Sequence, residues 1–226
     1  MARTAVLTPS LGRFNYVWSV VSNIEKATPE DHIQFWCVGE RHYIEQLHEL
    51  SRMYPGQIEW MDDSDDDDKR YVTRMNKMAR LVRERGGYDY VFFGQDDVVY
   101  HDGWLSEAAN AMIDDTRAVL VNDMRKPKGT QVLMATDYLP LAVFDDPESV
   151  FYSGYRHNFA DDEQHETARL RGVLGEARRS KVEHMHPMLD GPSRRPWDET
   201  YARSQGNWEH DAALYERRMA QVRKAL

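Results

Sequence analysis

The sequence lacks the features that define several classes of protein. Among its 226 residues it has one cysteine, Cys37, so it forms no disulfide within the chain and offers no cysteine pair for zinc. No apolar run approaches the roughly 18 residues that a membrane span requires. The first residues reach a proline and a polar turn before the apolar segment of a signal peptide develops. We therefore expect a cytoplasmic globular protein whose apolar core suffices for folding.

Positively charged residues are outnumbered by acidic ones over the first 164 residues. The net charge is −9, and residues 1 to 164 carry 17 Lys and Arg against 29 Asp and Glu, whereas residues 165 to 226 carry 12 against 9. The acidic majority disfavours broad binding to nucleic acid, because a phosphate backbone would be repelled. The mildly basic C-terminal segment suits a local contact with an anion.

Short apolar segments alternate with longer segments of helical periodicity, which is typical of βαβ units and a mainly parallel sheet. The pattern predicts strands over residues 4–7, 33–38, 57–60 and 88–94, with helices over 14–27, 41–53 and 70–86 between them. Beyond residue 100 it predicts helices over 103–114, 161–171 and 210–225, strands over 118–121, 131–135 and 181–185, and a loop around 140–150. We expect one α/β domain over residues 1–190 and a C-terminal loop and helix over 191–226.

Two adjacent acids follow the most apolar predicted strand. Residues 88 to 94 read YDYVFFG and run through Gln95 into Asp96 and Asp97. In an open α/β sheet, ligands bind outside the carboxyl ends of the strands. A pair of carboxylates at that place is typically held by a cation, and oxygen ligands suit Mg²⁺ or Mn²⁺. The alternative is a turn in which an aspartate caps the next element.

A second acidic segment holds six aspartates within residues 62 to 68. For most of this run we expect a solvated, self-repelling loop. Asp62 and Asp63 differ from the rest, because they directly follow the third predicted strand and so fall at the ligand-binding edge of the sheet.

Several short motifs together resemble the GT-A glycosyltransferases, small single-domain enzymes of the family-2 type. The matching segments are TPSLGR at residues 8–13, QDD at 95–97, HNFADDEQHETARLRG at 157–172 and VEHMHP at 182–187. The resemblance implies a Rossmann-like mixed sheet flanked by helices, with a short helical C-terminal extension. It also implies a nucleotide-sugar donor, for which we expect a UDP-sugar.

The resemblance implies a donor site on the N-terminal half of the chain. The residues expected to hold the nucleotide sugar are Thr8, Pro9, Ser10, Arg13, Asp62 or Asp63, Asn76, Lys77 and Asp96, with Arg74 among the polar contacts. A turn with backbone N–H groups and a guanidinium suits a diphosphate or a base edge. An ordinary β-to-α turn, and a solvated face of the helix over 70–86, are the alternatives for these residues.

The resemblance also implies a divalent cation, Mn²⁺ or Mg²⁺. This sequence has Gln95 where the family's DxD motif has its first acid, which leaves Asp97 as the expected metal ligand. A histidine after a late strand completes the metal site in the family, and we prefer His184 to His186. Imidazole nitrogen favours Mn²⁺ over Mg²⁺.

A carboxylate at the start of a helix is expected to activate the acceptor. The resemblance places Asp161 in this role, with Asp162 as the adjacent alternative, and implies inversion at the anomeric carbon. A structural alternative is a capping box, in which Asp161 caps the helix together with Gln164.

The predicted function is therefore the transfer of a sugar from a nucleotide-diphosphate donor to an acceptor hydroxyl. The acceptor is not specified by the sequence: basic residues of the C-terminal segment suit an anionic acceptor, including modified nucleic acid, and suit a solvated surface equally well. A nucleotidyltransferase would need a glycine-rich basic loop after the first strand, which TPSLGR does not provide. A non-catalytic binder of sugars or nucleotides is the other alternative, and a metal-dependent nuclease fits the acidic charge poorly.

Overall fold

A computed structural model describes residues 2–10, 14–38, 43–66, 68, 70–124, 129–187 and 196–226. The strands are β1 (Thr4–Ser10), β2 (His32–Val38), β3 (Ile58–Asp62), β4 (Tyr90–Phe93), β5 (Val98–Tyr100), β6 (Ala118–Asn122), β7 (Val132–Ala135) and β8 (Leu174–His184). The helices are α1 (Phe14–Ala27), α2 (Ile44–Met53), α3 (Tyr71–Arg85), α4 (Trp104–Ala109), the 3-10 helix η2 (Thr136–Leu141), α5 (Ala160–Leu170), α6 (Glu199–Gly206) and α7 (Trp208–Ala225).

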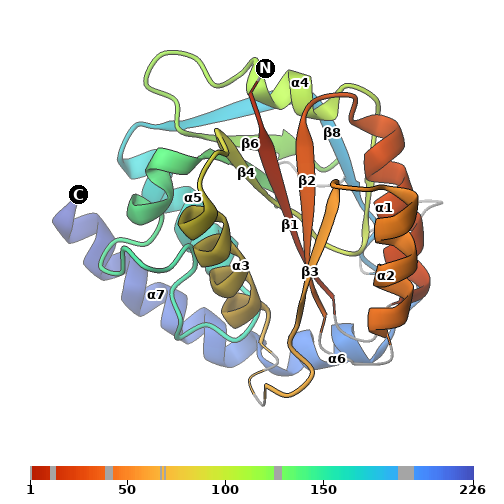
Figure 1. Ribbon diagram of the computed structural model, residues 1–226. Helices are drawn as coiled ribbons and strands as arrows, with labels where there is room; N and C mark the ends of the chain where they lie inside the picture. Colours follow the sequence, from red (N-terminus) through yellow and green to blue (C-terminus); the bar gives the residue numbers. More distant parts are fainter. Residues whose placement is uncertain are drawn as a thin grey trace.

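The strands form one mixed sheet in the order β3-β2-β1-β4-β7-β6-β8-β5 (Figure 1). Strands β1 to β4 are mutually parallel, β7 runs antiparallel to both β4 and β6, and β5 runs antiparallel to β8. In the parallel part each strand is followed by a helix that leads to the next strand, as the alternating sequence pattern predicts. The predicted α/β class, with a Rossmann-like mixed sheet flanked by helices, is confirmed.

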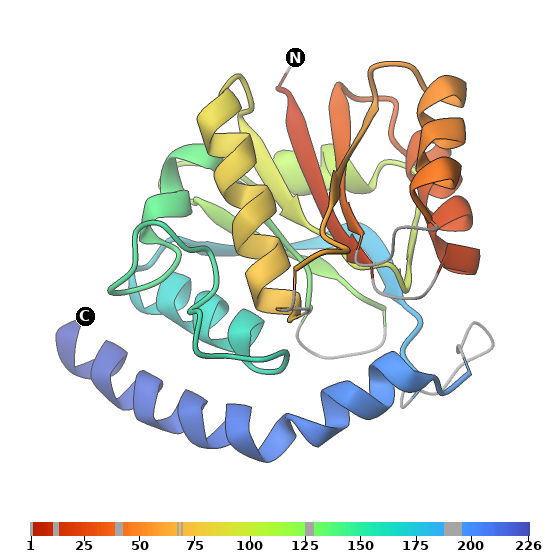
Figure 2. The same ribbon diagram turned by 60° about the horizontal axis from the view of Figure 1, so that its bottom comes forward.

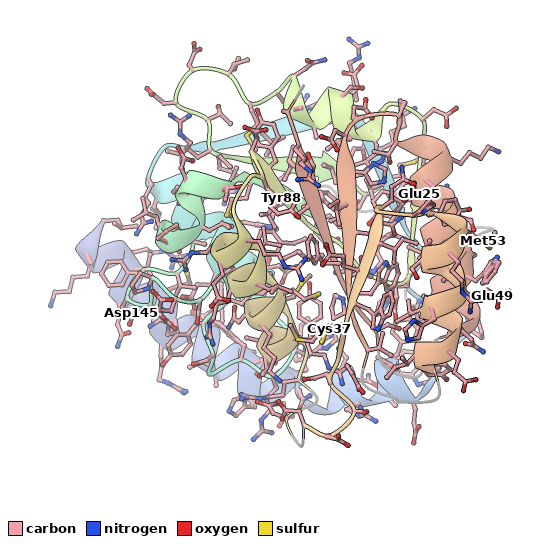
Figure 3. All side chains as sticks on the ribbon, in the orientation of Figure 1. Glu25, Cys37, Glu49, Met53, Tyr88 and Asp145 are labelled. Carbon is pink, nitrogen blue, oxygen red and sulfur yellow. The ribbon has the colours of Figure 1, made fainter. Side chains whose placement is uncertain are left out.

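The sheet is buried on both faces because its strands carry apolar residues at odd and even positions alike. Leu7 and Phe93 face α3 and α5, whereas Val6 and Phe92 face α1, α2 and α4. Figure 3 shows side chains filling both sides of the sheet, with Cys37 inside the fold and Met53 at the surface. Burial raises the pKa of the Cys37 thiol to about 12, so the thiol stays protonated, as expected of a core residue.

The C-terminal half differs from the predicted elements in several places. Strand β8 begins at Leu174, whereas the prediction began it at residue 181. The first part was not recognised because a bulge opposite Asn122 interrupts the alternation of charged and buried residues along the strand. Helix α4 ends at Ala109, short of 114. Strand β5 and helix α6 have no counterpart in the prediction: β5 is three residues long, and α6 has one buried residue, Tyr201, so neither shows a clear apolar period.

Helices α6 and α7 run along the side of the molecule at which the parallel strands end (Figure 2). Helix α7 packs against α5, and the rings of Phe159 and Trp208 lie 4.7 Å apart at this contact. The C-terminal segment therefore lies beside the edge of the sheet where the candidate site residues gather. No helix in the described part of the chain is long and apolar enough to cross a membrane.

Candidate functional site

The first part of the site joins the ends of β1 and β4. These strands are parallel neighbours, so Ser10 at the end of β1 lies close to the acids that follow β4. The Ser10 hydroxyl donates a hydrogen bond of 2.9 Å to Oδ2 of Asp96, and both residues are buried. A Cβ added at Gly94 would stand 2.7 Å from the Tyr100 hydroxyl, so a larger residue could not occupy this turn without a shift. The predicted donor residues Ser10 and Asp96 are thus brought together.

A buried ion-pair cluster follows β3. Asp63 accepts from Arg74 Nε at 3.0 Å on one carboxylate oxygen and from Lys77 Nζ at 2.6 Å on the other. Arg74 also donates to the Ser10 carbonyl at 3.2 Å, which connects this cluster to β1. Its remaining amino group, Nη2, is buried and has no hydrogen-bond partner among the residues that the structure describes. A buried guanidinium with an unused donor is costly unless a ligand supplies an acceptor.

The other donor-site predictions have different surroundings. Thr8 is buried with its hydroxyl unpartnered, and Pro9 is buried within β1. Asn76 bonds the backbone of Val150 and Phe151 with both ends of its amide, which gives it a structural task. Asp62 is exposed and accepts from the Ser64 N–H, and Arg13 lies outside the described residues.

The third part of the site pairs Asp97 with His184. Strands β5 and β8 are in register at Val98 and His184, which sets the imidazole beside the acid that precedes β5. His184 Nε2 lies 3.5 Å from Asp97 Oδ2, and the same oxygen accepts a 2.7 Å hydrogen bond from the Tyr201 hydroxyl of α6. The His186 ring instead faces Tyr201, at 4.6 Å between centroids. Within the described ranges, no group of three His, Cys, Asp or Glu side chains could hold a metal ion.

Asp161 and Asp162 face different parts of the molecule. Helix α5 begins at Ala160 after Phe159, whose backbone is left-handed (φ 62°), and no side chain caps it. The capping-box alternative is therefore wrong, and Gln164 donates instead to the Val150 carbonyl. The negative charge of Asp161 raises the pKa of Tyr71, whereas that of the exposed Asp162 raises the pKa of Tyr215 of α7.

Tyr71 connects the separate parts of the site, and the sequence interpretation missed it. Burial raises the pKa of its hydroxyl, and so does the negative charge of Asp161, Asp97 and Asp96, while a hydrogen bond with Gln95 acts in the opposite direction. The charges of all three carboxylates thus act on this one hydroxyl, which is hydrogen-bonded to Gln95. Tyr71 is the first residue of α3, directly after a loop, and it gives no signal in the sequence beyond that position.

The loop that leads to Asp161 is held by buried charges of α7. Asp211 is fully buried and accepts from the backbone N–H groups of Arg156, His157 and Asn158 at 2.8 to 3.0 Å. Arg218 pairs with Glu163 of α5 at 2.8 Å and, through two hydrogen bonds of 2.7 Å, with Asp145, which lies beside α7 in Figure 3. These contacts fix α5, and with it Asp161, against the C-terminal helix.

Comparisons with known proteins identify the fold. No family model and no curated protein matches the sequence. Among solved structures, the mannosyltransferase PcManGT from Pyrobaculum calidifontis, in complex with GDP-Man and Mn²⁺, is similar with a TM-score of 0.64 at 11% identity, over 82% of this chain and 58% of that chain. Residues 1–349 of S. aureus TarS are similar with a TM-score of 0.56 at 11% identity, over 77% of this chain and 57% of that chain. The chain has the fold of the GT-A glycosyltransferases and spans less than two thirds of each of these structures.

Proposed function

We propose that the chain is a glycosyltransferase that moves a sugar from a nucleotide-diphosphate donor to an acceptor hydroxyl. The observation that carries the proposal is that the Ser10–Asp96 pair, the Asp63–Arg74 ion pair and the Asp97–His184 pair all lie at the carboxyl edge of a GT-A sheet. This edge is where α/β sheets bind ligands. The fold alone would not suffice, because one fold hosts many functions.

The nucleotide would bind between β1, β3 and α3. Ser10 and Asp96 form a hydroxyl–carboxylate pair there, and the Thr8 hydroxyl and Arg74 Nη2 are buried polar atoms that lack a partner within the described part of the chain. A base or ribose that accepts from Arg74 would satisfy one of them. Lys77 contributes positive charge at the same place, and we expect a UDP-sugar, with a GDP-sugar as the alternative. We leave Asn76 out of the nucleotide contacts because the backbone uses its amide.

Asp97 and His184 would hold the divalent cation. A carboxylate oxygen and an imidazole nitrogen are donors that Mn²⁺ accepts, and two protein ligands leave coordination positions for phosphate oxygens and water. When bound, such an ion neutralises the charge that develops on the leaving diphosphate. The PcManGT structure contains both GDP-Man and Mn²⁺, which supports this assignment by analogy of fold.

Asp161 would act as the base. It lies in the first turn of α5, and its charge acts on Tyr71 together with those of Asp96 and Asp97, whereas the charge of Asp162 acts on Tyr215 of α7; this supports Asp161 over Asp162. Removing a proton from the acceptor hydroxyl makes that oxygen a better nucleophile at the anomeric carbon, and attack opposite the diphosphate inverts the configuration. Tyr71, on which the charges of all three acids act, would contact the acceptor or the sugar.

The test combines ligand binding with donor turnover. UDP, GDP, UDP-glucose and GDP-mannose are screened by thermal shift with MnCl₂ or EDTA, because a ligand that binds only the native state raises its stability. Release of the nucleotide from the sugar donor is then followed by ³¹P NMR, with water and with a panel of simple glycosides as acceptors. We expect one nucleotide series to bind and its sugar donor to be cleaved.

Single substitutions assign the roles. Asp161→Asn should keep nucleotide binding and lower turnover by roughly 10²-fold or more, whereas Asp97→Asn should remove the Mn²⁺-dependent part of the thermal shift. Asp115→Asn, at an exposed site away from these acids, is the matched control. Unchanged turnover in Asp161→Asn would remove it as the base, and binding without any turnover would favour a nucleotide-binding module.

A further inference from the structure

Helix α6 places one polar group into the site from outside the matched sequence motifs. Asp198 caps the helix by accepting from the Tyr201 N–H at 3.1 Å, and this cap starts the helix so that Tyr201 lies on its inner side. Tyr201 is the buried residue of α6, at 4% exposure. A helix of eight residues is too short to be stable by itself, so α6 depends on the contacts of this side chain.

The Tyr201 hydroxyl donates a hydrogen bond to Asp97. It donates to Oδ2 at 2.7 Å, and the same oxygen lies 3.5 Å from His184 Nε2. A carboxylate oxygen has two lone pairs, and the phenol uses one of them. Hydrogen bonds to a charged acceptor are roughly twice as strong as those between neutral groups, so this contact restricts how the carboxylate rotates.

The surrounding rings fix the phenol in turn. The Tyr201 ring contacts the His186 ring at 4.6 Å and the Trp197 ring at 6.0 Å, and His186 contacts His184 at 5.6 Å. His184 is the last residue of β8 and His186 follows it closely, so one packed group of rings holds both the Tyr201 phenol and the His184 imidazole. The relative position of Asp97 and His184 is therefore set by α6 as well as by the sheet.

Helix α7 anchors α6 from the other side. Asn207 is at once the C-cap of α6 and the N-cap of α7, so no loop separates the two helices. Asp211, in the first turn of α7, binds three backbone N–H groups of residues 156 to 158. Movement of Tyr201 is thus tied to the loop that precedes Asp161.

We propose that Tyr201 is a positioning residue for Asp97, which holds the carboxylate in the orientation that it needs to bind a divalent cation together with His184. This inference rests on the proposed function for the identity of the ligand, and it adds a residue from the C-terminal helices to the site. The phenol acts through Asp97 and does not itself contact the cation. Removing such supporting hydrogen bonds typically costs 10- to 100-fold in metal affinity.

The experiment measures Mn²⁺ binding to the full chain by electron paramagnetic resonance, in the presence of saturating UDP or GDP, whichever binds. Tyr201→Phe removes the hydroxyl and keeps the ring, and we expect Mn²⁺ to bind about 10-fold or more weakly. Affinity for the nucleotide in EDTA should stay unchanged, a separation that general loss of structure would not produce. Tyr215→Phe, the same substitution elsewhere in the C-terminal helices, is the control and should bind Mn²⁺ as the unsubstituted protein does.

Three results would overturn the inference. Equal Mn²⁺ affinity in Tyr201→Phe and the unsubstituted protein would show that the phenol does not position Asp97, while the proposed function would stand. Tighter Mn²⁺ binding in Tyr201→Phe would show that the hydroxyl competes with the ion. Absence of Mn²⁺ binding in the unsubstituted protein would remove the metal assignment itself, and the positioning role with it.

Discussion

The two sides of the site are assembled by different kinds of contact. On the side of β1, β3 and α3, Asp63 is paired with Arg74 and Lys77, which lie 11 and 14 residues away in the sequence. On the side of α5, the supporting charges come from the C-terminal helices, and Arg218 and Asp211 reach partners 53 to 73 residues away. The ion pairs of Asp63 are thus local to one βα unit, although Ser10 links this side to residues 64 and 86 positions away, whereas the ion pairs of the second side all join α7 to distant segments.

The difference teaches where each side is vulnerable. A local ion pair re-forms whenever its βα unit folds, because little chain must be closed to make it. The α5 side forms only once α7 has docked, so a fault in the C-terminal helix reaches Asp161 although the residues of α5 are unchanged. This contrast can be measured as the loss in the free energy of unfolding when one arginine is removed from each side.

The largest effect is expected from Arg218→Met. The guanidinium lies between Glu163 and Asp145 and over the Tyr152 ring at 3.7 Å. Removing it leaves Glu163, which is 2% exposed, as a buried charge without its cation, and such losses cost about 3–5 kcal/mol. Urea unfolding measures the change in free energy. Arg217→Met, at the exposed neighbouring position, should change it by about 0.5 kcal/mol or less.

A loss of less than about 1 kcal/mol in Arg218→Met would contradict the claim that α7 anchors α5, since the removal of a buried pair should cost more. The double variant Arg218→Met with Glu163→Gln should recover part of the loss, because the uncompensated charge is then absent.

A smaller effect on stability is expected from Arg74→Met. Asp63 keeps Lys77 as its cation, so the cost is that of lost charged hydrogen bonds, about 1.5–3 kcal/mol. The effect on ligand binding should be larger here than in Arg218→Met, because Arg74 carries the unpartnered Nη2 group. Urea unfolding and nucleotide thermal shifts check the two halves of this prediction.

The matched control for Arg74→Met is Arg80→Met, an exposed position on the same helix. If Arg74→Met costs as much as Arg218→Met, or if it binds the nucleotide unchanged, the proposed contrast between a locally paired donor side and a remotely supported acceptor side is wrong.

The same contrast explains what the sequence could predict. The four parallel strands and the helices over 14–27 and 70–86 follow from apolar periodicity, and the pairing of Ser10 with Asp96 follows from two adjacent parallel strands. The proximity of His184 to Asp97 required the register of β5 and β8, and β5 was not predicted. Tyr201 was missed because a single buried phenol on an otherwise exposed helix leaves no apolar period to detect, and Asp211 because a buried carboxylate in the first turn of a helix looks in sequence like an ordinary acidic helix start.

Asn76 shows a different limit. A polar residue on the site-facing end of α3 is indistinguishable in sequence from a ligand contact, and only its geometry shows an amide bonded to the backbone of residues 150 and 151. Periodicity identifies which residues face inward, but the partner of a buried polar group depends on loops whose conformation no local pattern specifies.

The smallest expected effect is on the pH dependence of stability, and it arises in the N-terminal part of the sheet. His32, at the start of β2, contacts the Glu25 carboxylate at 3.2 Å and the Glu30 carbonyl at 2.9 Å. Burial by itself disfavours the imidazolium, but the hydrogen bonds to Glu25 and Glu30 and the charges of both residues outweigh it, so the pKa of His32 is raised. The imidazolium therefore stabilises the fold fully below the unfolded-state pKa of about 6.5, and this contribution is lost as the pH rises through the higher folded-state pKa.

Urea unfolding between pH 5.5 and 9 tests this for the unsubstituted protein and for His32→Gln. We expect His32→Gln to be less stable by about 1–2 kcal/mol at low pH, between the contributions of a neutral and of a charged hydrogen bond, with the difference in stability narrowing as the pH rises. Arg217→Met, at an exposed position of α7, should retain the same pH dependence as the unsubstituted protein. A gap between His32→Gln and the unsubstituted protein that widens with rising pH would mean that His32 is neutral in the fold, and the sign of its coupling to Glu25 would be reversed.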